Sequence, residues 1–203
     1  WTPPLETLDM LLVTVPHAKR EESGAHDEGA IRMIPHLKKA LDSEGVDYEI
    51  LVGDTYRSII DLNRGEARNT KFAKDMRELL KKSRYHIDLH SFPEVSDDAS
   101  DQESVTAMGD DLRNWSVSDV VLLTIPNITD PVFLEEMLIG LEEIVIVDDI
   151  QTDDYNFITV FAQVAMDVPS ILLELNEGSV QAYPAIAARV ARVVGRLLDS
   201  VVA

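Results

Sequence analysis

Residues 85–91, Tyr-His-Ile-Asp-Leu-His-Ser, combine a short apolar segment with acidic and imidazole side chains. The apolar residues predict a buried strand over residues 85–89. Asp88 and His90 lie where this strand ends. In open α/β sheets, ligands bind outside the carboxyl ends of the strands, so polar residues at such an end are candidates for a functional site.

Strand and helix patterns alternate on both sides of this stretch. Further strands are predicted at residues 8–15, 48–52, 120–125, 144–147 and 170–175, and helices at residues 30–43, 67–82, 132–140, 155–165 and 185–202. This alternation predicts a single α/β domain over residues 1–203, with a mixed, largely parallel central sheet and helices on both faces. Residues 93–109 are rich in Ser, Asp and Glu and show no period, so they are predicted to form a long loop.

The composition is that of a globular protein, with 45% hydrophobic and 27% charged residues in a chain of 203. No apolar run approaches the roughly 20 residues that span a bilayer. No signal peptide pattern is present, and we expect a cytoplasmic protein, although a signal peptide removed earlier would leave no trace. The chain has no cysteine, so any transition-metal site must be built from His, Asp and Glu.

The net charge is −19, from 37 acidic and 18 basic residues. Nucleic acids and anionic membranes bind mainly through clustered Lys and Arg, so we expect neither as a partner. A small-molecule or peptide substrate fits better, because a local basic pocket can hold an anion inside an acidic protein. The sequence does not indicate an oligomeric state.

Two other predicted strands also carry polar residues at their carboxyl ends. Residues 8–15 lead into His17, and residues 170–175 contain Glu174. Together with His90, these side chains suit a zinc hydrolase, which uses three protein ligands and leaves one position for water. A lone His after a strand is more often a hydrogen-bonded structural residue. A carboxylate within the apolar run around Glu174, however, is costly to bury unless it is paired or bound.

Of the five histidines, His36 and His86 are expected to have structural roles. The remaining three, His17, His26 and His90, are candidates for chemistry.

Three segments resemble, in order along the chain, those of the zinc carboxypeptidase superfamily. They are Asp61-Leu62-Asn63-Arg64, Asp88-Leu89-His90-Ser91 and Leu173-Glu174-Leu175. The branches that they resemble are compact amidohydrolases: N-formylglutamate amidohydrolase, aspartoacylase and succinylglutamate desuccinylase, and poly-γ-glutamate hydrolase. The resemblance implies a metallocarboxypeptidase-like fold and one zinc ion per chain.

The resemblance also implies roles for individual residues. It makes His17 and His90 zinc ligands and Glu174 the general base. It assigns carbonyl polarisation to Arg57 and substrate carboxylate binding to Asn63 and Arg64. Tyr155, in the segment before the last strand, is a further candidate for orienting substrate.

The second zinc ligand is the point at which the sequence departs from the superfamily. The common spacing is His-x-x-Glu, but the third residue after His17 is Arg20. The poly-γ-glutamate hydrolase branch resembles His-x4-Glu-x-Gly, which selects Glu22 here. Four alternatives stay open because a short loop could turn any of them inward, namely Glu21, His26, Asp27 and Glu28.

The resemblance implies zinc-dependent hydrolysis of an amide bond next to a free carboxylate, as in an N-acyl amino acid such as N-formylglutamate. A metallocarboxypeptidase or a γ-glutamyl peptide hydrolase is the first alternative. The second is a binding protein that keeps the fold without the chemistry, which the departure at Arg20 would support. A metal-free doubly wound binding module is the third, and it would make the histidines at the strand ends coincidental.

Overall fold

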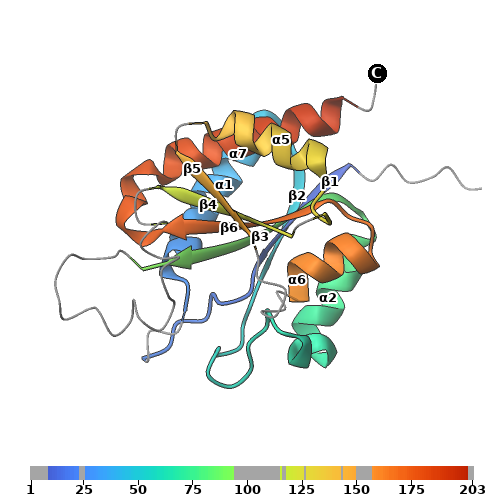
Figure 1. Ribbon diagram of the computed structural model, residues 1–203. Coiled ribbons are helices and arrows are strands. Elements are labelled where there is room, and N and C mark those ends of the chain that lie inside the picture. The colour runs from blue at the N-terminus through green and yellow to red at the C-terminus, as the bar shows by residue number, and fades with distance from the viewer. Residues whose placement is uncertain are drawn as a thin grey trace, which may run out of the picture.

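A six-stranded sheet forms the centre of the protein (Figure 1). The computed structural model describes residues 9–22, 26–93, 115, 118–125, 127–142, 144–149 and 157–200. The strands are β1 Met10–Val15, β2 Asp47–Val52, β3 Ser83–Phe92, β4 Val120–Thr124, β5 Val145–Asp149 and β6 Ser170–Asn176. Each of the six predicted strands is therefore present, with ends that differ by up to three residues.

The strand order is β2-β1-β3-β6-β4-β5. The neighbours from β2 to β6 are parallel, β4 is antiparallel to β6, and β5 is parallel to β4. The prediction of a mixed, largely parallel sheet is thus confirmed. Because β2 and β3 lie on opposite sides of β1, the strand order reverses there. A crevice at the carboxyl ends of β1 and β3 is where such a sheet binds ligands.

Helices cover both faces of the sheet. They are α1 Glu28–Glu44, α2 Lys71–Leu80, α5 Pro131–Gly140, α6 Phe157–Val160 and α7 Tyr183–Asp199, with the short helical turns η1 Gly65–Asn69, η3 Phe161–Ala165 and η4 Glu177–Ala182. In Figure 1, α1, α5 and α7 lie on one face and α2 and α6 on the other. Among the described helices, none has the length and apolar character needed to cross a membrane.

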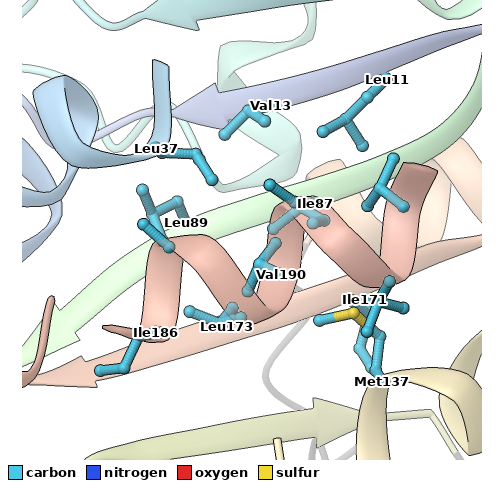
Figure 2. Close-up of a cluster of buried hydrophobic side chains, with 14 of the residues drawn as sticks. Leu11, Val13, Leu37, Ile87, Leu89, Met137, Ile171, Leu173, Ile186 and Val190 are labelled. Atoms are coloured by element: carbon cyan, nitrogen blue, oxygen red, sulfur yellow. The ribbon is translucent and has the colours of Figure 1, made fainter. Parts of the chain in front are cut away.

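The two faces of the sheet have separate apolar cores. Because strand side chains alternate between faces, the odd-numbered residues of β1, β3 and β6 pack against α1 and α7. Figure 2 draws this first core, which includes Leu11, Val13, Leu37, Ile87, Leu89, Ile171, Leu173, Ile186 and Val190. On the other face, Leu12 packs with Phe72 and Met76 of α2 and Ile158 of α6. The even-numbered positions on this second face also carry the polar residues of the site.

Two of the predicted helices do not form one continuous α-helix in the structure. Residues 67–82 form η1 and α2 rather than one helix, because Thr70 is extended and its hydroxyl oxygen accepts a hydrogen bond from the N–H of Ala73 at 3.2 Å. This is an N-cap, which starts a new helix. The helix predicted at residues 155–165 is described from Phe157, and after Val160 it continues as the wider π-helical turn η3. The long loop predicted at residues 93–109 lies, apart from Pro93, outside the described residues.

Candidate metal centre

Two histidines meet at the point where the strand order reverses. His17 follows β1 by two residues and His90 lies near the carboxyl end of β3, and these two strands are parallel neighbours. Their ring centroids are 4.9 Å apart, and both side chains are buried. The sheet therefore brings together two residues that are 73 positions apart in the sequence, as expected from their places at strand ends.

Asp27 is the third member of this cluster. The chain after His17 folds back, so that the N–H of Asp27 donates to the carbonyl oxygen of His17 at 3.0 Å. The carboxylate oxygen Oδ2 of Asp27 lies 3.2 Å from Nδ1 of His17 and 2.9 Å from Nδ1 of His90. Each of the three residues offers a ligand atom, and these atoms all lie within 4.8 Å of one another.

Each imidazole also has a further carboxylate next to its other ring nitrogen, Nε2. Nε2 of His17 lies 2.7 Å from Oδ1 of Asp61, and Nε2 of His90 lies 3.2 Å from Oδ2 of Asp88. Histidines that bind metal commonly direct the other ring nitrogen to a carboxylate, which fixes the tautomer and the ring orientation. The donor set, two imidazole nitrogens and one carboxylate oxygen, is one that zinc accepts. The residues present therefore fit a zinc ion.

The pKa values in this buried cluster are shifted toward the charged forms of its residues. Burial alone would raise the pKa of Asp27, but the hydrogen bonds with His17 and His90 lower it well below its usual range. Burial would likewise raise the pKa of Asp61, and its bond with His17 lowers it. The pKa of His90, which burial would lower, is instead raised well above its usual value by Asp88 and Asp27. In the metal-free cluster, positive charge is thus stabilised where a cation would lie.

Glu174 lies beside this cluster on the neighbouring strand. In the register of β3 and β6, its Cα pairs with that of His90. Burial of the carboxyl group raises the pKa of Glu174 to about 7, and the charge of the nearby His90 opposes this shift. A carboxyl group with a pKa near neutrality can both accept and return a proton. A bound cation would lower this pKa.

Two arginines border the site on the opposite side. Nε of Arg57 lies 3.3 Å from Oδ2 of Asp61, and one terminal nitrogen lies 3.7 Å from Oδ1 of Asp27. Nε of Arg64 lies 3.7 Å from the same Asp61 oxygen. The Arg57 and Arg64 side chains are 37% and 39% exposed. The segment that follows β2 therefore brings two cations to the site without burying them.

Asn63 lies on the inner side of this segment. Its side chain is buried, with Nδ2 3.1 Å from Nε2 of His90, and Oδ1 accepts a hydrogen bond from the N–H of Ile158 at 3.3 Å. The Asn63 amide thus links the arginine segment, β3 and α6. Binding a substrate carboxylate would require it to exchange one of these partners. Tyr155 lies outside the described residues.

The candidates for the second ligand separate clearly. Glu22, the residue selected from the spacing, is exposed at the surface and is absent from the cluster. Glu21 accepts hydrogen bonds from the N–H and the hydroxyl of Ser58. Glu28 pairs with Arg20 and Arg32, and His26 lies 3.5 Å from Glu28. Among these candidates, Asp27 is the one that reaches both histidines.

Sequence reasoning did not assign roles to Asp61 and Asp88, although both belong to the segments that carry the family resemblance. Each lies two positions before a residue that was assigned, Asn63 or His90. In β3 that spacing is informative, because residues two apart point to the same face of a sheet.

Comparison with protein-family models and with curated proteins found no match for this sequence. Solved structures of the same fold were found. The gene product Atu2144 from Agrobacterium tumefaciens has a TM-score of 0.63 and 16% identity, and the match covers 96% of this chain and 92% of that one.

Two further matching structures carry names of hydrolases. N-formylglutamate amidohydrolase from Ralstonia eutropha JMP134 has a TM-score of 0.56 and 14% identity, with 98% of this chain and 96% of that chain covered. A metallo-carboxypeptidase from Burkholderia cenocepacia has a TM-score of 0.60 and 12% identity; 96% of this chain matches 57% of that longer one. The predicted metallocarboxypeptidase-like fold is therefore confirmed. At these identities the similarity concerns the fold.

Proposed function

We propose that this protein is a zinc-dependent hydrolase that cleaves an amide bond next to a free carboxylate. The observation that carries the proposal is the buried cluster of His17, Asp27 and His90, whose ligand atoms lie within 4.8 Å of one another. It lies at the sheet position where α/β folds bind ligands. The likeness in fold to N-formylglutamate amidohydrolase and to a metallo-carboxypeptidase supports the same class of reaction.

We assign His17, Asp27 and His90 as the ligands of one zinc ion, with Asp27 in place of Glu22. Zinc bound there would lower the pKa of a water molecule and polarise the scissile carbonyl group. Asp61 would keep the His17 imidazole in the orientation that directs Nδ1 to the metal, because its Oδ1 lies 2.7 Å from Nε2 of that ring. Asp88 places a negative charge 3.2 Å from Nε2 of His90, on the side of that ring away from Asp27.

The remaining chemistry falls to residues beside the cluster. Glu174 takes the proton of the attacking water and returns it to the leaving nitrogen, a role for which its place beside His90 is suited. Arg57, which lies within 4 Å of both Asp27 and Asp61, stabilises the oxyanion that develops on the carbonyl oxygen.

Substrate selection is assigned to Arg64. Its guanidinium group is partly exposed at the border of the site and has the planar donor geometry that suits a carboxylate. Asn63 remains a candidate for the same contact if it exchanges an internal partner, and Tyr155 a candidate for orienting the substrate. The preferred substrates are N-acyl amino acids, since the chain matches N-formylglutamate amidohydrolase over nearly its whole length. C-terminal or γ-linked glutamyl peptides are the alternative.

The experiment has two parts. Elemental analysis of protein never exposed to a chelator should find about one zinc per chain. Hydrolysis is then measured on N-acyl amino acids and short peptides, each with a free and a blocked carboxylate. Arg64→Ala should raise KM strongly for the free acids and much less for the blocked ones, because only the ionised group gains charge-assisted bonds.

Arg64→Lys is the matched variant, which keeps the charge but lacks the two parallel donors and should recover little activity. A wild-type protein that neither contains nor takes up zinc would rule out the metal centre and favour a binding protein of the same fold. Equal activity on free and blocked substrates would instead show that the enzyme does not recognise a carboxylate, while it would still be a hydrolase.

A further inference from the structure

Helix α1 begins in an unusual way. Asp27 is its N-cap residue, and aspartate at this position ordinarily accepts a hydrogen bond from the N–H two or three residues later. Here the Asp27 side chain makes no such bond. Its carboxylate points instead to His17 and His90. The first N–H groups of α1 therefore need another acceptor.

Two residues that are distant in the sequence supply that acceptor. The N–H of Gly29, two residues after the N-cap, donates to Oγ of Ser91 and to Oε1 of Glu177, each at 3.1 Å. The Ser91 hydroxyl in turn donates to the same Glu177 oxygen at 2.7 Å. Ser91 belongs to β3, and Glu177 follows β6 directly. The helix is thus capped by side chains that lie 62 and 148 positions away in the sequence.

Gly29 allows this close approach. A Cβ atom at position 29 would lie 2.5 Å from the hydroxyl oxygen of Tyr183 and 2.7 Å from Cβ of Ser91. The Tyr183 hydroxyl is itself fixed, because it donates to the carbonyl oxygen of Asn176 at 3.0 Å. The start of α1 is therefore packed directly against the carboxyl ends of β3 and β6, with no room for a side chain between them.

We propose that Ser91 and Glu177 are positioning residues that free the Asp27 carboxylate to bind the metal. This inference rests on the proposed metal centre. Because the Ser91–Glu177 pair satisfies the N–H of Gly29, Asp27 has no need to cap its own helix and can turn to the histidines. Without the pair, this N–H would lack its two acceptors, and it belongs to the residue two after the N-cap, which an Asp N-cap side chain ordinarily binds, so capping would compete with metal binding.

The test is the zinc dissociation constant, measured by competition with a chelator, together with the melting temperature of the metal-free protein. Glu177→Ala should weaken zinc binding on the order of 10- to 100-fold, the range found when outer-shell partners of metal ligands are removed. Ser91→Ala should have a smaller effect in the same direction. Glu177→Gln should bind zinc nearly as wild type, because its side-chain oxygen can accept the same hydrogen bonds.

A matched control is available in α5. Oδ1 of Asp130 accepts a hydrogen bond from the N–H of Phe133 at 2.8 Å, an ordinary N-cap within its own helix. Asp130→Ala should lower the melting temperature, as loss of a cap does, and leave the zinc dissociation constant unchanged. It thus separates a general loss of stability from a specific loss of metal affinity.

Each outcome decides a different point. Zinc binding by Glu177→Ala as tight as that of wild type would overturn the inference while leaving the metal centre intact. A parallel loss in Glu177→Gln would also overturn it, since the effect would then not depend on the accepting oxygen. If Glu177→Ala does not fold, the comparison of Ser91→Ala with Asp130→Ala takes its place. Failure of the wild-type protein to bind zinc would overturn the proposed function as well.

Discussion

Glu174 lies next to His90 in the sheet, and its pKa of about 7 separates it from an ordinary surface carboxyl group. Glu174→Gln should lower kcat by about 10²- to 10⁴-fold, because the amide keeps the shape of the side chain but cannot move a proton. Zinc content and melting temperature should stay close to those of wild type, since Glu174 is not one of the three proposed ligands.

The measurement is steady-state kinetics on the best substrate of the panel, with zinc content determined on the same samples. Glu49→Gln is a suitable control, because it removes the same charge from an exposed position on β2 at the far side of β1. Near wild-type turnover in the Glu174 variant would show that another group moves the proton.

The sequence pattern indicated the positions of candidate residues that lie in or near strands, but not the position of the one that follows a loop. His90 and Glu174 lie within strands and His17 lies two residues after one, so their common edge could be inferred from the strand pattern. Asp27 lies ten positions after His17, and the path of the intervening loop is not encoded in any period. The position of Asp27 just before a helix predicts an N-cap role, so this signal does not select Asp27 as a metal ligand.

Strand β3 has a polar face that leads into the site. Its residues His86, Asp88 and His90 point to one side, where Thr14 of β1 and Ser170 of β6 meet them. The Thr14 hydroxyl donates to Oδ1 of Asp88 at 2.6 Å and lies 2.9 Å from Nε2 of His86, whose Nδ1 lies 2.6 Å from Oγ of Ser170. These bonds extend across three strands and hold Asp88 behind His90.

His86 makes this face sensitive to acid. Burial lowers the pKa of His86 to about 4, although the charge on Asp88 opposes the shift. In the unfolded chain its pKa is about 6.5. Between these values the unfolded state binds a proton that the folded state does not, so the free energy of unfolding falls as the pH falls from about 6.5 to 4. Above about pH 6.5 His86 is neutral in both states, and its burial causes no pH-dependent loss of stability.

We therefore expect His86→Asn to show a weaker loss of stability in acid than wild type. A shift of this size corresponds to about 3 kcal/mol between pH 6.5 and pH 4. Urea denaturation of the metal-free proteins at a series of pH values measures the difference in slope. The matched control is His36→Asn, which removes a partly exposed imidazole of α1, a helix on the other face of the sheet from His86. Equal slopes for wild type and the His86 variant would contradict the prediction.

Secondary structure could be predicted from periodicity, whereas strand order could not. The apolar runs located every strand of the sheet, but the insertion of β6 between β3 and β4 depends on contacts distant in sequence. Periodicity also did not predict the break at Thr70. The apolar pattern continues through this position, but the Thr70 side chain caps a new helix there.

At the scale of the whole molecule, acidic residues outnumber basic ones, although two arginines lie next to the site. The site gathers Arg57 and Arg64 at its border, while the chain as a whole carries a net charge of −19. Such an excess destabilises a compact state through self-repulsion. The proposed anionic substrate would need a local source of positive charge, and Arg57 and Arg64 are placed to supply it.

The repulsion should make stability depend on salt. Raising sodium chloride from about 0.01 M to about 0.5 M shortens the screening length from about 30 Å to a few ångströms, so the melting temperature of the metal-free protein should rise. Circular dichroism melts in the presence of a chelator measure the effect.

The matched variant combines Asp47→Asn, Glu49→Gln and Glu142→Gln, three exposed acids, and lowers the net negative charge by three from −19. It should melt at a higher temperature than wild type in low salt and respond less to added salt. An equal response of the two proteins would mean that salt acts on water and apolar surface, and not on the net charge.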